Sequence, residues 1–197
     1  MSGTSNIPIP HNEPVLSYAP GSRERADLKS ALGSVGGQQA DIPAVVNGRE
    51  IRTGITENVV SPHCHRRVLA RVHQSDRATI DAAVTGAIEA QREWGSWRFE
   101  DRAAVFLRAA ELLATNHRQI LNAATMLGQS KTAYQAEIDS ACELIDFLRF
   151  NVHYAERIYS EQPQSSPGVW NRMDYRPLEG FVYAITPFNF TAIGGNL

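Results

Sequence analysis

The chain has 197 residues, of which 43% are hydrophobic, and its 19 Lys and Arg against 21 Asp and Glu give a formal charge of −2. This composition is that of a globular protein and excludes a mostly disordered chain. The near-neutral balance argues against binding through bulk positive charge, so we expect no nucleic-acid partner. The sequence also lacks a run of about 20 apolar residues, so we expect no membrane partner.

The cysteines predict the compartment of the protein. Cys64 and Cys142 are too few for the disulfide framework of a small secreted domain, and we expect both to be reduced thiols. The first thirty residues contain several prolines and no continuous apolar run, which is typical of neither a secretory signal nor a basic presequence. The sequence therefore predicts a cytoplasmic protein whose mature chain starts here.

The first third of the chain favours β structure after a short arm. Residues 1–40 mix prolines, glycines and charges, and we expect a surface arm with one helix over 22–32 and a flexible stretch after it. Asn47-Gly48 lies between β-favouring residues, the strongest short-range signal for a hairpin with a type I′ turn. A second hairpin is expected from residues 59–62 and 68–72.

Helical periodicity begins at Ser75. Ser75 or Asp76 can cap an Ala-rich helix that ends near Gly95. The residues spaced for one face of this helix are Ile80, Ala83, Val84, Ala87, Ile88 and Gln91. A second helix fits residues 100–116 and a shorter one follows to Leu127. Over residues 132–160, apolar side chains recur at spacings of four and three, which predicts one long amphipathic helix packed against its neighbours.

The last forty residues change character. We expect a loop over 161–168 and an exposed strand over 171–175. Residues 180–186 form a near-continuous apolar, β-branched run, typical of a strand buried on both faces of a parallel sheet, and a turn entering a helix follows Pro187. A parallel strand needs a partner about a dozen residues further on. We therefore predict an α/β protein and infer that the chain is an N-terminal fragment.

Five short motifs carry a family resemblance. Residues 185–196 (ITPFNFTAIGGN) resemble the aldehyde dehydrogenase superfamily. The closer resemblance is to its delta-1-pyrroline-5-carboxylate dehydrogenase branch and rests on MLGQSKT (126–132), QAEID (135–139), ELIDFLRFN (143–151) and YRPLEGFV (175–182). It starts near residue 12 and covers nearly the whole chain. It implies NAD-dependent oxidation of L-glutamate γ-semialdehyde, a small-molecule aldehyde, to L-glutamate in proline degradation.

The resemblance also implies an architecture, the N-terminal part of the aldehyde dehydrogenase fold. Residues 1–40 would form an arm, 41–160 the β hairpins and helices that pack on the NAD domain, and 161–179 a loop and an oligomerisation-flap strand. Residues 180–197 would be the first core strand and helix start of a Rossmann-like NAD-binding domain, truncated here. The complete enzyme would be a homo-oligomer.

Asn189 is the expected catalytic residue. Its amide is a neutral donor that can face a developing oxyanion without disturbing a thiolate, and the family places its transition-state-stabilising Asn at the matching position. The alternative is that Asn189 caps the following helix. Ile185, Thr186, Pro187 and Phe188 are the expected cofactor contacts, since open α/β sheets bind ligands at the carboxyl ends of strands. Plain strand-end packing is the alternative, above all for Ile185.

Two further residues match substrate-site positions of the family. Phe190 resembles the aromatic wall of the aldehyde tunnel, although a Phe after a buried strand is core by default. Glu137 resembles a glutamate that lines the substrate pocket, although a glutamate beside a helix stripe is usually a solvated flank. His63-Cys64-His65 is interpreted as an exposed hairpin turn, and we expect no metal because zinc needs three or four ligands.

The chain lacks the family's catalytic nucleophile. Cys64 and Cys142 have no glycine-rich context, so we expect the fragment to be inactive alone. Two alternatives stay open: a dehydrogenase for another acid semialdehyde, and a short non-catalytic scaffold that pairs with full-length subunits.

Overall fold

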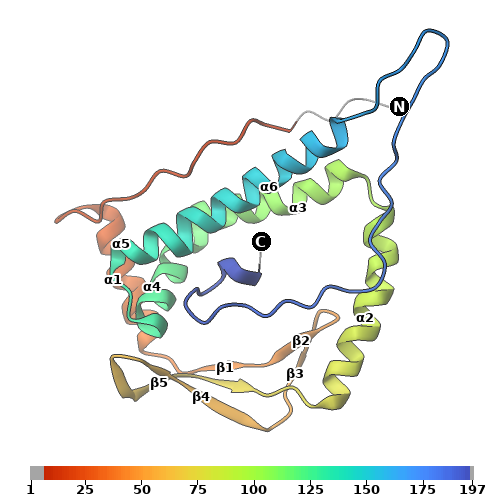
Figure 1. Ribbon diagram of the computed structural model, residues 1–197. Helices are drawn as coiled ribbons and strands as arrows, with labels where there is room; N and C mark the ends of the chain where they lie inside the picture. Colours follow the sequence, from red (N-terminus) through yellow and green to blue (C-terminus); the bar gives the residue numbers. More distant parts are fainter. Residues whose placement is uncertain (1–6, 196–197) are drawn as a thin grey trace.

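The computed structural model describes residues 7–195 as two small sheets beside a layer of helices (Figure 1). The strands are β1 (Ala40–Ile42), β2 (Ala44–Val46), β3 (Arg49–Ile51), β4 (Thr56–Ser61) and β5 (Cys64–His73). The helices are α1 (Arg23–Gly36), α2 (Arg77–Ser96), α3 (Phe99–Leu112), α4 (Arg118–Gln129), α5 (Ala133–Ala136) and α6 (Glu143–Ser160). None of them is long and apolar enough to cross a membrane.

Both predicted hairpins are confirmed. β2 pairs antiparallel with β3 across Asn47 and Gly48, whose φ angles of 52° and 71° lie in the left-handed region that a type I′ turn requires. β4 pairs antiparallel with β5 around Pro62 and His63. The sequence did not predict β1, which pairs parallel with the far edge of β5 and completes a sheet of order β1-β5-β4.

The arm is more tightly packed than the sequence predicts. α1 begins after Ser22, whose hydroxyl accepts a hydrogen bond from the Arg25 amide, and continues to Gly36 rather than ending at Leu32. Tyr18 and Leu28 are buried in one cluster with Ala123 of α4. Most side chains of residues 16–36 are exposed, as expected of a surface arm, but Tyr18 and Leu28 are buried because they pack against α4.

Four of the six α-helices within residues 7–195 form two long runs. α3 continues through a π-helical turn, η1 (Leu113–His117), into α4, and α5 continues through a second one, η2 (Glu137–Cys142), into α6. The predicted helix over 132–160 is thus confirmed as one continuous run, opened by a capping box between Thr132 and Gln135. This run contributes to one buried hydrophobic cluster, which consists of Ala110, Ala141, Leu144, Ile145, Leu148 and Ile193.

The predicted strand over 180–187 is not formed. Residues 181–187 run without ladder pairing and are exposed, and the one helical element within residues 188–195 is a 3₁₀ turn, η3 (Ile193–Gly195). The expected strand over 171–175 is also missing. A strand is defined by its partners, and the described chain offers these segments none. The apolar face of α2 is likewise open, with Ile80 and Ile88 exposed.

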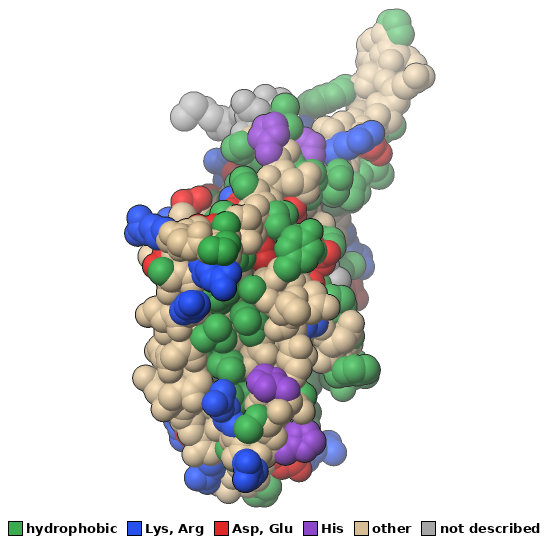
Figure 2. All heavy atoms as spheres, turned by 90° about the vertical axis from the view of Figure 1, so that its left-hand side faces the viewer, with side chains coloured by type: hydrophobic (Ala, Val, Ile, Leu, Met, Phe, Trp, Pro, Cys, Tyr) green, Lys and Arg blue, Asp and Glu red, His purple; other side chains and the backbone are tan. Residues whose placement is uncertain are grey.

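The surface carries mixed charge. On the face turned toward the viewer in Figure 2, Lys and Arg side chains are separated by acidic, apolar and uncharged groups. This distribution matches the near-neutral composition and forms no continuous basic field on that face.

Candidate functional site

The segment 188–193 is anchored on the helix layer. The Gln129 side chain donates to the carbonyl of Phe188 at 3.3 Å, and the hydroxyls of Thr125 and Thr191 lie 2.6 Å apart. Ile193 inserts into the core cluster of α3 and α6, with Phe190 packed beside it. Residues 185–189, the predicted site residues before Phe190, are nevertheless exposed and lie at the surface of the molecule.

Asn189 lies in an exposed turn. Its backbone carbonyl accepts a hydrogen bond from the Lys131 ammonium at 2.6 Å. η3 begins only at Ile193, four positions later, and no described backbone amide donates to the Asn189 side chain. Among residues 7–195, the helix-cap alternative therefore finds no support, and the Asn189 side-chain amide makes no hydrogen bond.

The predicted cofactor contacts form an open, extended stretch. Ile185 is 82% exposed and Phe188 96% exposed, so neither packs at a strand end. Within residues 7–195, the peptide groups of Ile185 and Thr186 make no hydrogen bond. A Cβ at Gly194 would lie 2.6 Å from the Pro187 ring, so glycine is needed for the chain to fold back against this stretch. Free peptide groups along an open backbone fit a cofactor bound through main-chain contacts.

Phe190 is half-buried between the core cluster and Lys131, whose ammonium nitrogen lies 5.0 Å from the ring centroid. This distance is that of a cation–π contact. The ring lies one residue beyond Asn189, at the border between the core and the exposed stretch. Asn189, Phe190 and residues 185–188 are consecutive in the chain, and their roles in a site stay predictions.

Glu137 is placed elsewhere. Its side chain is fully buried and forms an ion pair with Arg118. The carboxylate also accepts hydrogen bonds from the Leu16 amide at 2.8 Å, the Tyr18 hydroxyl at 2.7 Å and the Asn122 side chain at 2.8 Å. Both oxygens are occupied, so Glu137 is neither a solvated flank nor free to bind a substrate. We therefore leave it out of the candidate site.

This cluster fastens the arm to the helices. Arg118 also pairs with Glu13 at 2.5 Å, and Glu13 pairs with Arg149 at 2.6 Å. Burial by itself raises the pKa of Glu137, but hydrogen bonds from Arg118 and Tyr18 outweigh it and hold the pKa below its ordinary value. Burial, reinforced by Glu137, raises the pKa of Tyr18 to about 12. No local sequence pattern indicates these contacts, because they join residues up to 136 positions apart.

The cysteines are poorly placed for nucleophilic attack. Cys64 is exposed at the start of β5, and Cys142 is buried beside the Glu137–Arg118 pair. Burial raises the pKa of the Cys142 thiol to about 12, with the Glu137 charge as a second cause. A thiol with this pKa stays protonated at neutral pH, so it is no nucleophile.

The His63-Cys64-His65 segment makes ordinary polar contacts. The His63 ring lies 2.8 Å from the Ser130 hydroxyl and 3.2 Å from that of Ser61. Between residues 7 and 195, no three His, Cys, Asp or Glu side chains are grouped so as to hold a metal ion.

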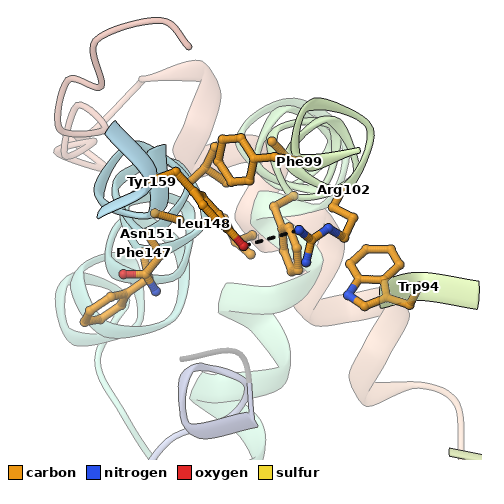
Figure 3. Close-up of a pocket in the computed structure, with 11 residues that line it drawn as sticks. Trp94, Phe99, Arg102, Phe147, Leu148, Asn151 and Tyr159 are labelled. Carbon is orange, nitrogen blue, oxygen red and sulfur yellow. Dashed lines mark hydrogen bonds between the residues drawn. The ribbon is translucent and has the colours of Figure 1, made fainter. Parts of the chain in front are cut away.

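A separate hollow of about 310 Å³ lies between α3 and α6 beside the end of α2 (Figure 3). Its lining is mostly aromatic and aliphatic, with Trp94, Phe99 and Phe147 among the contributors. Figure 3 shows Arg102 pointing toward Tyr159, whose hydroxyl accepts a hydrogen bond of 3.4 Å from it. None of the predicted site residues borders this hollow.

Three comparisons with known proteins bear on the site. The sequence model of the aldehyde dehydrogenase family matches residues 51–194. Delta-1-pyrroline-5-carboxylate dehydrogenase of Agaricus bisporus is 50% identical over 196 residues, and the mitochondrial enzyme of that name from Dictyostelium discoideum is 52% identical over 194. Each match covers 98% of this chain but only 36% and 35% of the relative. The chain thus spans about a third of the length of these relatives.

A solved structure is similar over the whole chain. The delta-pyrroline-5-carboxylate dehydrogenase of Mycobacterium tuberculosis, crystallised with NAD, is 53% identical and superposes with a TM-score of 0.96. The match covers 100% of this chain and 37% of that one.

Proposed function

The chain belongs to the aldehyde dehydrogenase family, and we propose that it forms the N-terminal part of an NAD-dependent enzyme that oxidises L-glutamate γ-semialdehyde to L-glutamate. The observation that carries the proposal is the match at 53% identity and a TM-score of 0.96 to a delta-pyrroline-5-carboxylate dehydrogenase bound to NAD. Curated relatives of the same name match the chain at about half of its positions.

In the proposed reaction, the side-chain amide of Asn189 donates a hydrogen bond to the oxygen of the attacked aldehyde as it becomes negative. A preorganised donor of this kind acts most strongly once charge has formed, so it lowers the barrier rather than tightening substrate binding. The exposure of Asn189 supports this role, as does the absence of a hydrogen bond to its side chain within residues 7–195. Phe190 closes the apolar side of the aldehyde site.

Residues 185–188 hold the cofactor through their backbone, with Thr186 as the expected contact. When bound, NAD supplies the acceptor for the hydride that leaves the substrate. The peptide groups of Ile185 and Thr186, which make no hydrogen bond within residues 7–195, support this assignment. The attacking thiolate belongs to the part of the relatives that this chain does not cover, because Cys64 and Cys142 lack the required setting.

Domain roles and assembly belong to the same proposal. Residues 41–160 would pack on the NAD domain, and residues 161–179 would carry the oligomerisation flap of a homo-oligomer. Residues 180–197 would form the start of the NAD domain. Of the proposed arm and NAD domain, residues 1–6 and 196–197 lie outside the described range. The sequence predicts a cytoplasmic location, whereas two of the relatives are named mitochondrial enzymes. Cell fractionation of the tagged protein distinguishes these two compartments.

Two experiments test the proposed function, one on the coding sequence and one on enzyme activity. The coding sequence beyond Leu197 should contain a glycine-rich segment with a cysteine, and its absence would favour a non-catalytic scaffold. The full-length product should reduce NAD with L-glutamate γ-semialdehyde, and the 197-residue chain should not. A preference for succinate semialdehyde would instead assign the enzyme to another acid semialdehyde.

A further inference from the structure

Lys131 is held in a fixed position next to the candidate site. Ser130 ends α4 in the left-handed conformation, with φ of 57°, and Thr132 opens α5 with a capping box. Lys131 is the one residue between these two caps, so its backbone is restrained on both sides. The side chain leaves this point toward the turn that carries Asn189.

The Lys131 ammonium reaches three groups at once. It forms an ion pair with Asp139 of η2, donates to the carbonyl of Asn189 at 2.6 Å and lies 5.0 Å from the centroid of the Phe190 ring. The side chain is only 17% exposed and that of Asp139 18%. An ammonium has three donors and a flexible stem, and Asp139 restrains that stem by fixing the charge.

Lys131 makes the one polar contact to Asn189 among the described residues. Neighbouring contacts hold the carbonyl of Phe188 and the hydroxyl of Thr191, on either side of the turn. Without the Lys131 bond, the carbonyl of Asn189 loses this partner, and a change in the backbone torsions of Asn189 redirects the Cα–Cβ bond that aims its amide. An error of about 1 Å in a catalytic group can cost about 10²-fold in rate.

We propose that Lys131, oriented by Asp139, is a positioning residue that aims Asn189 at the developing oxyanion. The proposal rests on the proposed function, since it assumes that Asn189 stabilises the transition state. Lys131 itself touches neither substrate nor cofactor in this scheme. It acts through the backbone of Asn189.

The test uses the full-length enzyme, NAD and L-glutamate γ-semialdehyde. We expect Lys131→Met to lower kcat about 10- to 10²-fold, with KM for NAD within about twofold of wild type. Lys131→Arg keeps a charged donor and should restore most of the rate. Lys29→Met is the matched control, because Lys29 is exposed on α1 and is the only other lysine of the chain. It should leave kcat unchanged.

A double-mutant cycle separates positioning from general damage. Asn189→Ala should lower kcat about 10²- to 10³-fold, and adding Lys131→Met to it should cost less than about twofold, because the group that Lys131 aims is gone. Multiplicative losses in the double variant would overturn the proposal, as would a wild-type kcat in Lys131→Met beside a damaged Asn189→Ala. A wild-type kcat in Asn189→Ala would overturn the oxyanion assignment and this proposal together.

Folding is checked separately. If Lys131→Met does not accumulate as folded enzyme, Asp139→Asn replaces it, because this change removes the ion pair and keeps the donor to Asn189. Asp139→Asn should lower kcat less than expected for Lys131→Met. The proposal is supported if Asp139→Asn causes no further loss in kcat when combined with Asn189→Ala. An undiminished loss on that background contradicts it.

Discussion

The buried pair of Glu137 and Arg118 allows a stability prediction from the structure. Glu137→Gln keeps the volume of the side chain but replaces one carboxylate oxygen by an NH₂ group. Both oxygens face donors in the folded protein: the Leu16 amide on one, the Tyr18 hydroxyl and Asn122 amide on the other, and Arg118 on both. In either orientation, the NH₂ group of the glutamine therefore faces another hydrogen-bond donor. Arg118 also loses the negative charge of Glu137.

The size of the effect follows from the burial of the pair. Removing one partner of a buried ion pair costs about 3–5 kcal/mol, since the other charge stays desolvated. Arg118 keeps Glu13 at 2.5 Å as a second partner. We therefore expect the lower end, about 3 kcal/mol, which is a large fraction of the ~5–15 kcal/mol that stabilises a typical domain.

Urea unfolding at neutral pH, followed by far-ultraviolet circular dichroism, measures this loss. With an m-value of about 2 kcal/mol/M, the midpoint should fall by about 1.5 M. Glu161→Gln is the matched control, because Glu161 pairs with Arg157 at 3.9 Å and both side chains are 72% exposed. It should cost less than about 0.5 kcal/mol. A Glu137→Gln midpoint within about 0.3 M of wild type would refute this reasoning.

Two further predictions concern the thiol and the exposed segment. Burial raises the pKa of Cys142 from 9.0 to about 12, so its contribution to stability is complete below pH 9 and is lost as the pH rises toward 12. Cys142→Ala should flatten the alkaline fall of the urea midpoint, and an unchanged slope would contradict the assignment. Val182 and Ile185 are more than 80% exposed, so the 197-residue chain should bind a hydrophobic dye. Val182→Lys with Ile185→Lys should lower the dye fluorescence, whereas full fluorescence would place the binding surface elsewhere.

The sequence predicted elements whose signals are local. The Asn47-Gly48 turn needs only two residues with positive φ, and the helix starts at Ser22, Asp76 and Thr132 need only a side chain that accepts from a nearby amide. Each signal is complete within a few residues. The hairpins and the helices that begin at these three caps were therefore confirmed, and their predicted ends differ from the observed ones by a few residues.

Distant contacts could not be predicted in this way. The predicted strand over 180–187 depends on neighbours that the described chain does not supply, so its apolar pattern is present without its sheet. Glu137 has the pattern of a helix flank, and only the fold brings Arg118 and the arm onto it. The resemblance assigned roles to Asn189 and Phe190, but it did not indicate a role for Lys131.

The most direct test of the central claim is the kcat of Asn189→Asp in the full-length enzyme with L-glutamate γ-semialdehyde and NAD. A carboxylate at this position repels both the oxyanion and the attacking thiolate, so the account predicts a loss at least as large as the ~10²- to 10³-fold loss of Asn189→Ala. NAD affinity should stay near wild type in both variants. A stable Asn189→Asp enzyme with wild-type kcat would contradict the claim that this turn supplies the oxyanion donor.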